Sequence, residues 1–184
     1  METLRTERLV LRPWREEDLA PFAELNADPG VMEYLQAPLS RPESDLLAQA
    51  IREHFAEHGY GLWAVELPGE HPFIGFVGLL HRPRESFPVP IAPCVEVSWR
   101  LRRDMWGHGY ATEAARAAIA QGFDELGLEE VVSFTTVGNG RSRRTMERLG
   151  MRRDMASDFD HPKLPEGHPL RRHVVYRLAR SSRR

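Results

Sequence analysis

Two glycines placed one residue apart are the first feature of the chain that suggests chemistry. Gly107 and Gly109 follow an alternating segment, residues 94–101, and precede a long segment with helical spacing that starts at Ala111. Glycine lets the backbone adopt positive φ values and approach a ligand closely, while the first N–H groups of a helix and its dipole attract an anion. Thr112 adds a hydroxyl donor. The pattern predicts a phosphate-binding turn, although two glycines before a helix also fit a plain tight turn.

Two other phosphate-binding motifs do not fit this segment. There is no G-x-x-x-x-G-K-[ST] sequence, so a P-loop nucleotide hydrolase is not supported. A dinucleotide-binding turn needs a third glycine where this chain has Thr112, and an acidic residue at the end of the next strand, whereas Glu129 and Glu130 precede that strand. A Rossmann-type oxidoreductase is therefore disfavoured.

The elements that position this turn follow from hydrophobic periodicity. Residues 94–101 alternate, with Glu96 on the polar face, and predict a strand. Apolar positions from Ala111 to Leu126 have helical spacing and small side chains, and Gly127 is expected to end this helix. The small face predicts close packing on a sheet.

The remaining elements complete a mixed α/β pattern. A helix is expected from Leu19 to a break at Asp28-Pro29-Gly30, and a second one runs over about residues 42–57 to a cap at Gly59. Further strands are predicted at 8–13, 62–67, 73–80, 131–137 and 173–178, and a short helix at 141–149. Residues 82–93 and 158–172 are rich in proline and are predicted to be loops.

The composition is that of an ordinary folded chain. Of the 184 residues, 41% are hydrophobic and 28% charged, so we expect one domain over residues 1–184. Cys94 is the single cysteine, which excludes an intramolecular disulfide and favours a reducing compartment; we expect it to be a packing residue. No apolar run approaches the roughly 18 residues that cross a bilayer, and the start lacks a signal-peptide core, so we expect a cytoplasmic protein with no membrane partner.

The charges are unevenly placed along the chain. A net charge of -2 argues against a general nucleic-acid binder, so no nucleic-acid partner is expected. Six arginines fall between Arg141 and Arg153 and six more between Arg171 and Arg184, which suits a small polyanion. Taken one at a time, most of them are explained more simply as a solvated face or as part of a tail at residues 181–184.

Three blocks of sequence together resemble the GNAT superfamily of acetyl-CoA-dependent N-acetyltransferases, in particular its branch of ribosomal-protein N-terminal acetyltransferases. They are residues 6–13, residues 106–114, and Asn139 to Ser142 followed by residues 146–151, and their order and spacing match over roughly residues 3–155. The resemblance implies an α/β GNAT fold, with a mixed, mostly antiparallel sheet flanked by helices. The sheet would splay between residues 95–101 and 131–137, with acetyl-CoA in the gap.

The resemblance also implies which residues bind this co-substrate. Backbone amides of residues 107–112 would hold the pyrophosphate, a strand would pair with the pantetheine arm, and an asparagine would lie beside the coenzyme. The implied set is Trp99, Leu101, Trp106, Gly107, His108, Gly109, Tyr110, Ala111, Thr112 and Asn139. Arg143 and Arg144 are close enough in sequence to help with the phosphates. Asn139 also fits a plain turn before a helix.

The implied chemistry is direct attack of an amine on a thioester, which needs a base for the amine and an acid for the departing thiolate. Glu96 is the candidate base, although a strand glutamate is more often an ion-pair partner. Many family members use a tyrosine as the acid where this chain has Met146, and Ser142 is the substitute that the branch suggests; it also fits a helix cap. The missing tyrosine keeps open a non-catalytic acyl-CoA-binding regulatory domain.

The acceptor is expected to be an amine, either a protein N-terminus or a small molecule, with specificity set by loops 82–93 and 158–172. His161, His168 and His173 fit no common zinc spacing, so no metal is expected. The aromatic side chains of Trp14, Trp63 and Phe76 are expected in the core, and the protein is expected to be a monomer or a homodimer.

Overall fold

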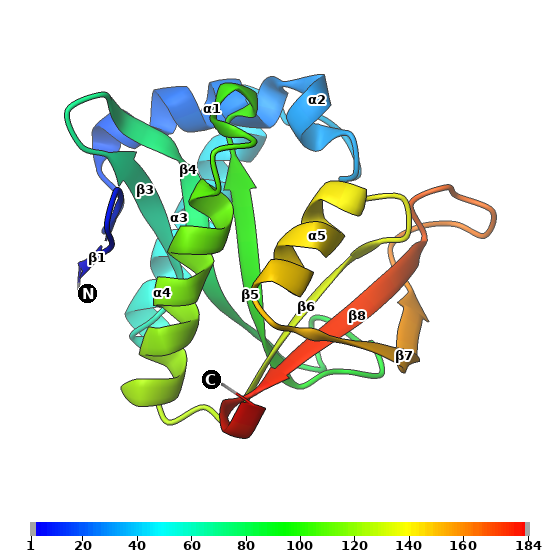
Figure 1. The fold of residues 1–184 in the computed structure, drawn as a ribbon. Coiled ribbons are helices and arrows are strands. Elements are labelled where there is room, and N and C mark those ends of the chain that lie inside the picture. The colour runs from blue at the N-terminus through cyan, green and yellow to red at the C-terminus, as the bar shows by residue number, and fades with distance from the viewer. Residues whose placement is uncertain (1–2, 183–184) are drawn as a thin grey trace.

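The computed structural model of the protein describes residues 3–182, which are built around one eight-stranded sheet (Figure 1). Its order is β1-β2-β3-β4-β5-β6-β8-β7, and neighbouring strands are antiparallel except β5 and β6, which are parallel. The strands are β1 (Leu4–Arg5), β2 (Val10–Arg12), β3 (Leu62–Leu67), β4 (His71–Arg82), β5 (Cys94–Leu101), β6 (Glu130–Thr136), β7 (Arg152–Asp160) and β8 (Arg172–Ala179). The predicted mixed, mostly antiparallel sheet is confirmed.

Helices cover both faces of the sheet. α4 and α5 lie on one face and α3 lies on the other, beside α1 (Figure 1). The helices are α1 (Leu19–Ala27), α2 (Pro29–Met32), α3 (Arg41–His58), α4 (Tyr110–Asp124) and α5 (Gly140–Arg148), with short 3₁₀ turns η1 (Glu16–Asp18), η2 (Arg103–Met105) and η3 (Arg180–Ser182). Residues 183–184 of the predicted tail lie outside the described residues.

Local signals in the sequence explain where the helices begin and end. α3 starts in a capping box, in which the Ser40 and Glu43 side chains each bond the other's backbone N–H, and ends at Gly59 with φ 75°. The predicted break at Asp28 ends α1 and also starts α2, because the Asp28 carboxylate accepts a 2.7 Å hydrogen bond from the Gly30 N–H.

Two sequence predictions are wrong in part. Residues 158–160 were predicted to be loop but belong to β7, which was not predicted. β7 is largely polar, and its register against β8 shifts between Asp154 and Phe159, so it has no regular alternation to recognise. Leu126 was placed on the apolar face of α4, but the helix ends at Asp124 and Leu126 is 36% exposed.

The core contains the aromatic residues expected there. Trp14, Trp63 and Phe76 are buried, and the Trp14 Nε1–H donates to the Leu62 carbonyl at 2.7 Å. Cys94 is half-buried against a small apolar cluster, and burial raises its thiol pKa to about 11, as suits a packing residue. None of the helices within residues 3–182 is long and apolar enough to cross a membrane.

The sheet opens between its two parallel strands. β5 is paired with β4 along its whole length, whereas the pairing of β5 with β6 among the described residues is confined to Glu96 and Val132. Beyond this pair the two strands diverge toward their C-terminal ends (Figure 1). The splay predicted between residues 95–101 and 131–137 is therefore present.

Candidate active site

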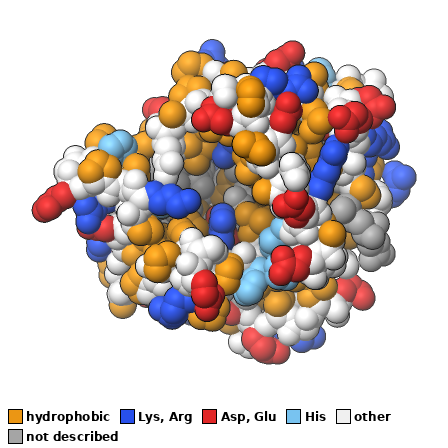
Figure 2. All heavy atoms as spheres, turned by 180° about the vertical axis from the view of Figure 1, so that it is seen from behind, with side chains coloured by type: hydrophobic (Ala, Val, Ile, Leu, Met, Phe, Trp, Pro, Cys, Tyr) orange, Lys and Arg blue, Asp and Glu red, His pale blue; other side chains and the backbone are white. Residues whose placement is uncertain are grey.

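A cavity of about 840 Å³ occupies the place where β5 and β6 diverge. Its walls come from both strands, from the N-terminal ends of α4 and α5, and from the segment between α2 and α3. Figure 2 shows the molecule hollowed on the side opposite to the view of Figure 1, with Lys or Arg side chains visible inside and histidines at the rim. The cavity reaches both faces of the sheet.

The N-terminus of α4 enters this cavity without a side-chain cap. Gly109 precedes the helix, and both it and Gly107 have φ 84°, a conformation that favours glycine. α3 and α5, in contrast, are capped by Ser40 and by Asn139. The first N–H groups of α4, at Tyr110, Ala111 and Thr112, are thus without a capping side chain and border the cavity, an arrangement suited to an anion.

The start of the chain holds this turn in place. The Glu113 carboxylate accepts hydrogen bonds from the Thr6 hydroxyl at 2.6 Å, from the Arg8 N–H at 2.9 Å and from the Arg8 Nε–H at 2.7 Å. Arg8 also donates to the His108 carbonyl at 3.0 Å. Two of the sequence blocks are therefore physically joined, which nothing in their spacing indicated. His108 is not among the cavity-lining residues, and its ring stacks on Tyr110.

The backbone of β5 presents unpaired groups to the opening. The Arg102 N–H donates to the Ile74 carbonyl at 2.9 Å, so this opposed pair is hydrogen-bonded. Opposed pairs of an antiparallel ladder alternate, so the N–H and C=O of Leu101 and Trp99 point away from β4, toward the gap. In agreement, the Trp106 Nε1–H reaches the Leu101 carbonyl from that side at 2.9 Å.

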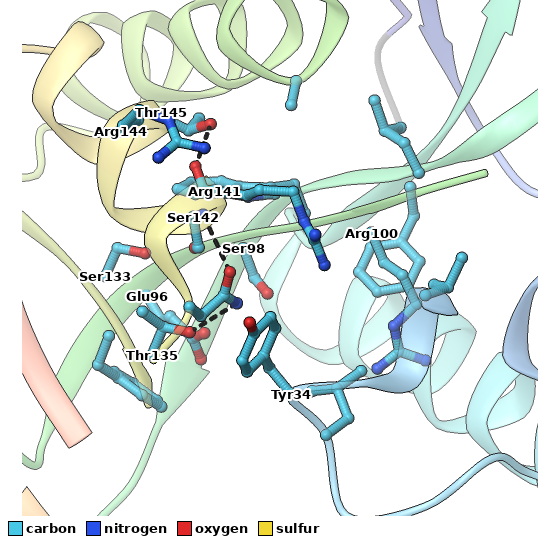
Figure 3. Close-up of a pocket in the computed structure, with 18 of the residues that line it drawn as sticks. Tyr34, Glu96, Ser98, Arg100, Ser133, Thr135, Arg141, Ser142, Arg144 and Thr145 are labelled. Carbon is cyan, nitrogen blue, oxygen red and sulfur yellow. Dashed lines mark hydrogen bonds between the residues drawn. The ribbon is translucent and has the colours of Figure 1, made fainter. Parts of the chain in front are cut away.

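Asn139 and Ser142 lie at the start of α5, on the wall formed by β6. The Asn139 side chain accepts from the Ser142 N–H at 3.1 Å and donates to the Thr135 hydroxyl at 3.0 Å (Figure 3). Asn139 is therefore the helix cap, and the alternative of Ser142 as the cap is wrong. The Ser142 residue borders the cavity.

Arginines of α5 divide between the cavity and the body of the protein. Arg144 lines the cavity, whereas Arg143 donates to the Tyr176 hydroxyl and to the Val137 carbonyl, both at 3.4 Å, and is not among the lining residues. Arg141 lies 4.4 Å above the centre of the Trp106 ring and pairs with Glu33 at 2.7 Å. Trp106 and Arg141 together close the wall between α4 and α5.

Glu96 is only 5% exposed and lies on the wall of the cavity. Arg82, at the end of β4, contacts it through Nε and Nη2, each 2.6 Å from Oε2. The ion-pair alternative for Glu96 is thus present in the structure. The same residue also lines the cavity.

The side chains of β5 point to two different faces of the sheet. Val97 is opposite Leu79, and the Leu79 side chain packs against Gly122 of α4. The odd-numbered residues of β5 therefore face α4. Arg100 is opposite Phe76, which packs against Phe22 of α1 with 6.0 Å between ring centres. Glu96, Ser98 and Arg100 therefore share the face opposite to the N-terminus of α4.

Several cavity residues were not singled out in the sequence. Tyr34, Leu35 and Gln36 line the cavity from the segment between α2 and α3. This segment has neither helical nor strand periodicity and lies between prolines, and such loops often carry binding residues. Arg100 was not singled out either, because it is one polar residue on the alternating strand that was predicted at residues 94–101. The loops 82–93 and 158–172 do reach the cavity, through Phe87 and His161 among others.

No metal-binding group is found in the part of the chain that the structure describes, where no three His, Cys, Asp or Glu side chains are placed to hold an ion. The rings of His161 and His173 lie 5.2 Å apart, and burial lowers the pKa of both imidazoles. His168 lies apart from the cavity and accepts a hydrogen bond from the Leu170 N–H at 3.1 Å.

Comparisons with known proteins agree with this architecture. The family model described as an acetyltransferase (GNAT) domain matches residues 8–152, so the chain belongs to this family. It is 30% identical over 149 residues to the uncharacterized protein YkkB of Bacillus subtilis strain 168, covering 80% of this chain and 84% of that protein. It is 32% identical over 157 residues to the FsC-acetyl coenzyme A-N(2)-transacetylase of Aspergillus fumigatus, covering 81% of this chain and 64% of that longer protein.

Solved structures show the same fold. An acetyltransferase from Agrobacterium tumefaciens strain C58 superposes with a TM-score of 0.77 at 30% identity, over 97% of this chain and 94% of that one. A spermidine N-acetyltransferase from Vibrio cholerae, solved with CoA and spermine, superposes with a TM-score of 0.72 at 19% identity, over 95% and 97% of the two chains. As a member of the GNAT family, the protein is an acetyltransferase that uses acetyl-CoA as its co-substrate.

Proposed function

We propose that this protein transfers the acetyl group of acetyl-CoA to a primary amine by direct attack of the amine nitrogen on the thioester. One observation carries the proposal. The cavity connects the uncapped N-terminus of α4 on one face of the sheet with Glu96, Ser98 and Arg100 on the other face. Donor and acceptor therefore meet from opposite sides at the opening between β5 and β6.

The donor half of the cavity fits the chemistry of the coenzyme. The uncapped amides of residues 107–112 suit a pyrophosphate, and Arg144 adds positive charge on the same wall. The outward N–H and C=O groups of Trp99 and Leu101 suit the amides of the pantetheine arm, as an added strand would. The Vibrio cholerae relative, of the same fold, was solved with CoA bound, which supports this assignment.

The reaction needs one proton removed and one supplied. The attacking group must be a neutral amine; as its nitrogen–carbon bond forms and the carbon–sulfur bond breaks, the nitrogen loses one proton and the departing thiolate gains one. Glu96 is the proposed acceptor of the amine proton, because it is the carboxylate on the acceptor face of the cavity wall. Ser142 is the proposed donor to the sulfur. Asn139 positions Ser142, because its side-chain oxygen caps α5 at the Ser142 N–H while its amide nitrogen donates to the Thr135 hydroxyl of β6.

The acceptor is proposed to be an amine because the named relative from Aspergillus fumigatus acts, by its name, at a nitrogen. The donor half of the cavity is compatible with either kind of acceptor, a protein N-terminus, as the resemblance to the ribosomal-protein branch implies, or a small-molecule amine. Transfer without an acyl-enzyme is favoured because Cys94 is half-buried and its thiol pKa is raised to about 11, which disfavours the nucleophilic thiolate.

The test is release of free CoA thiol from acetyl-CoA across a panel of primary amines and peptide N-termini. Direct attack predicts that thiol release depends on the acceptor. It also predicts intersecting lines in double-reciprocal plots of the initial rate when both substrates are varied. Parallel lines would instead indicate an acyl-enzyme. Tight acetyl-CoA binding with no release on any amine would favour the alternative, a non-catalytic regulatory domain.

A further inference from the structure

Arg100 is a charged group on the acceptor face of the cavity whose charge has no partner of opposite sign in the part of the chain that the structure describes. Its Nη1–H donates to the Asn26 side-chain oxygen at 2.5 Å, and its guanidinium lies 5.3 Å from the centre of the Phe76 ring. No ion pair within residues 3–182 includes Arg100. Arg82, on the same face, is in contrast paired with Glu96.

The partner of Arg100 within the protein is a neutral amide that is itself fixed. Asn26 is fully buried, and its amide nitrogen donates to the Ser44 hydroxyl at 2.8 Å. This contact holds the guanidinium in one orientation and uses one of its five N–H donors. Burial lowers the pKa of Arg100 to about 10, which marks the cost of keeping the charge where it is. An anion entering the cavity would offset that cost.

The position of Arg100 separates it from the coenzyme phosphates. Its side chain lies on the face of the sheet that carries Phe76 and α1, whereas the uncapped N-terminus of α4 lies on the other face. Figure 3 shows Arg100 and Glu96 at different ends of the cavity, with Ser98 and Tyr34 in the space between them. The anion that meets Arg100 is therefore carried by the acceptor.

We infer that Arg100 binds a carboxylate of the amine acceptor, so that the substrate class is a molecule with an amine at one end and a carboxylate at the other. This inference rests on the proposed amine acetylation. Glu96 and Arg100 lie four residues apart on one strand, so their Cα atoms are about 13 Å apart. The amine and the carboxylate must then be separated by several bonds, as in an ω-amino acid or a short peptide, and not by one carbon.

The test compares acceptors that differ only in the carboxylate. 6-Aminohexanoate is paired with hexylamine, and glycylglycine with glycylglycinamide, and kcat/KM is measured by thiol release at saturating acetyl-CoA. A charge-assisted contact predicts that, in the pair whose carboxylate fits the cavity better, kcat/KM is about 10-fold or more higher for the carboxylate than for its partner without one. Arg100→Met, which keeps a long side chain over Phe76, should abolish this preference and leave hexylamine turnover within about twofold. Arg100→Lys should keep part of it.

Arg102→Met is the matched control, because Arg102 directly follows β5, pairs with Asp104 at 2.7 Å and is not among the cavity-lining residues. This variant should keep the wild-type preference. Acetyl-CoA affinity, measured by calorimetry, should be unchanged in all three variants, which shows that the donor site is folded.

The outcomes distinguish the inference from the proposed function. If the wild type acetylates both members of each pair equally, or if Arg100→Met slows both members alike, Arg100 does not bind an acceptor carboxylate, while amine acetylation stands. If no amine is acetylated, amine acetylation fails. The inference is then decided by calorimetric binding of 6-aminohexanoate to CoA-saturated protein, and equal binding by wild type and Arg100→Met would overturn it.

Discussion

Arg82 holds Glu96 by a single carboxylate oxygen, with its Nε and Nη2 atoms each 2.6 Å from Oε2. Both donors contact the same oxygen, so Oε1 takes no part in that contact. Because Glu96 is only 5% exposed, this orientation is well defined. The pair is therefore the ion pair that the sequence allowed for, and it would also orient Glu96 for the proposed role as base.

Replacing Glu96 by glutamine tests its role as the base. Glu96→Gln keeps the size of the side chain and an oxygen for Arg82, but the amide cannot accept the amine proton. We expect kcat/KM to fall by about 10²-fold or more, the usual contribution of a general base. Rates are measured at several pH values between about 6 and 9, and the loss should be present at each of them. Full activity at every pH would remove Glu96 from the mechanism.

Gly109→Ala tests the turn before α4. Its φ of 84° strains any residue with a Cβ, while the nearest neighbour of an added Cβ is Arg8 Nη2 at 3.6 Å. The strain, about 1–2 kcal/mol, should shift the turn, and we expect acetyl-CoA affinity to fall about 10-fold. Gly127→Ala is the control at the other end of α4, with φ 66° and open space around the added Cβ. Gly127→Ala should lower the stability by a similar amount and leave the acetyl-CoA affinity unchanged. Equal acetyl-CoA affinity in both variants would contradict a phosphate site at Gly109.

The contact between Glu113 and Arg8 should stabilise both the fold and the turn. Glu113→Gln replaces this carboxylate, which is 17% exposed, by an amide, and Arg8→Met removes one of its partners, so we expect each to lower the free energy of unfolding. Because both residues hold one contact, the double variant should lose less than the sum, as measured by urea denaturation. Fully additive losses would show that the two side chains act independently.

His54 predicts a pH dependence of stability. Burial, with a further contribution from the nearby His58, lowers its pKa to about 4. The neutral ring accepts from the His81 N–H and bonds the Tyr60 carbonyl, both at 3.0 Å. Between pH 6.5 and about 4 the unfolded chain binds more protons here than the folded one, so unfolding free energy falls as the pH falls.

The contribution of His54 should be on the order of 1–2 kcal/mol, allowing for solvent screening of a half-buried ring. Urea denaturation of wild type and His54→Gln between pH 7 and about 4 measures it. The difference in unfolding free energy between the two proteins should shrink toward pH 4. A difference that is constant over this range would mean that His54 titrates alike in both states.

Much of the fold could be predicted because the relevant signals are local. The alternation of residues 94–101 and the small face of α4 each identify one element without reference to its neighbours. β7 escaped prediction because its register shift near Asp154 removes the alternation that marks a strand. Its place at the edge of the sheet depends on pairing with β8, and a local pattern does not carry that information.

The candidate site was predicted in part for the same reason. Gly107 and Gly109 need positive φ, and glycine itself signals that need in the sequence. The unpaired charge of Arg100 has no such signal, because a polar residue on a strand face is ordinary until its neighbours are known. Asn26 and Phe76, which hold it, come from distant parts of the chain. Only tertiary structure shows that no carboxylate reaches this arginine within the described residues.

The central claim, acetyl transfer to an amine without an acyl-enzyme, is tested most directly by mass spectrometry of acceptor and protein after incubation with acetyl-CoA. We expect an amine that gains one acetyl group, in an amount equal to the CoA thiol released, while the protein keeps its unmodified mass during turnover. An acetylated protein that forms and decays at the rate of turnover would contradict direct attack. Coenzyme binding with no acetylated amine, on any acceptor, would contradict the transfer itself.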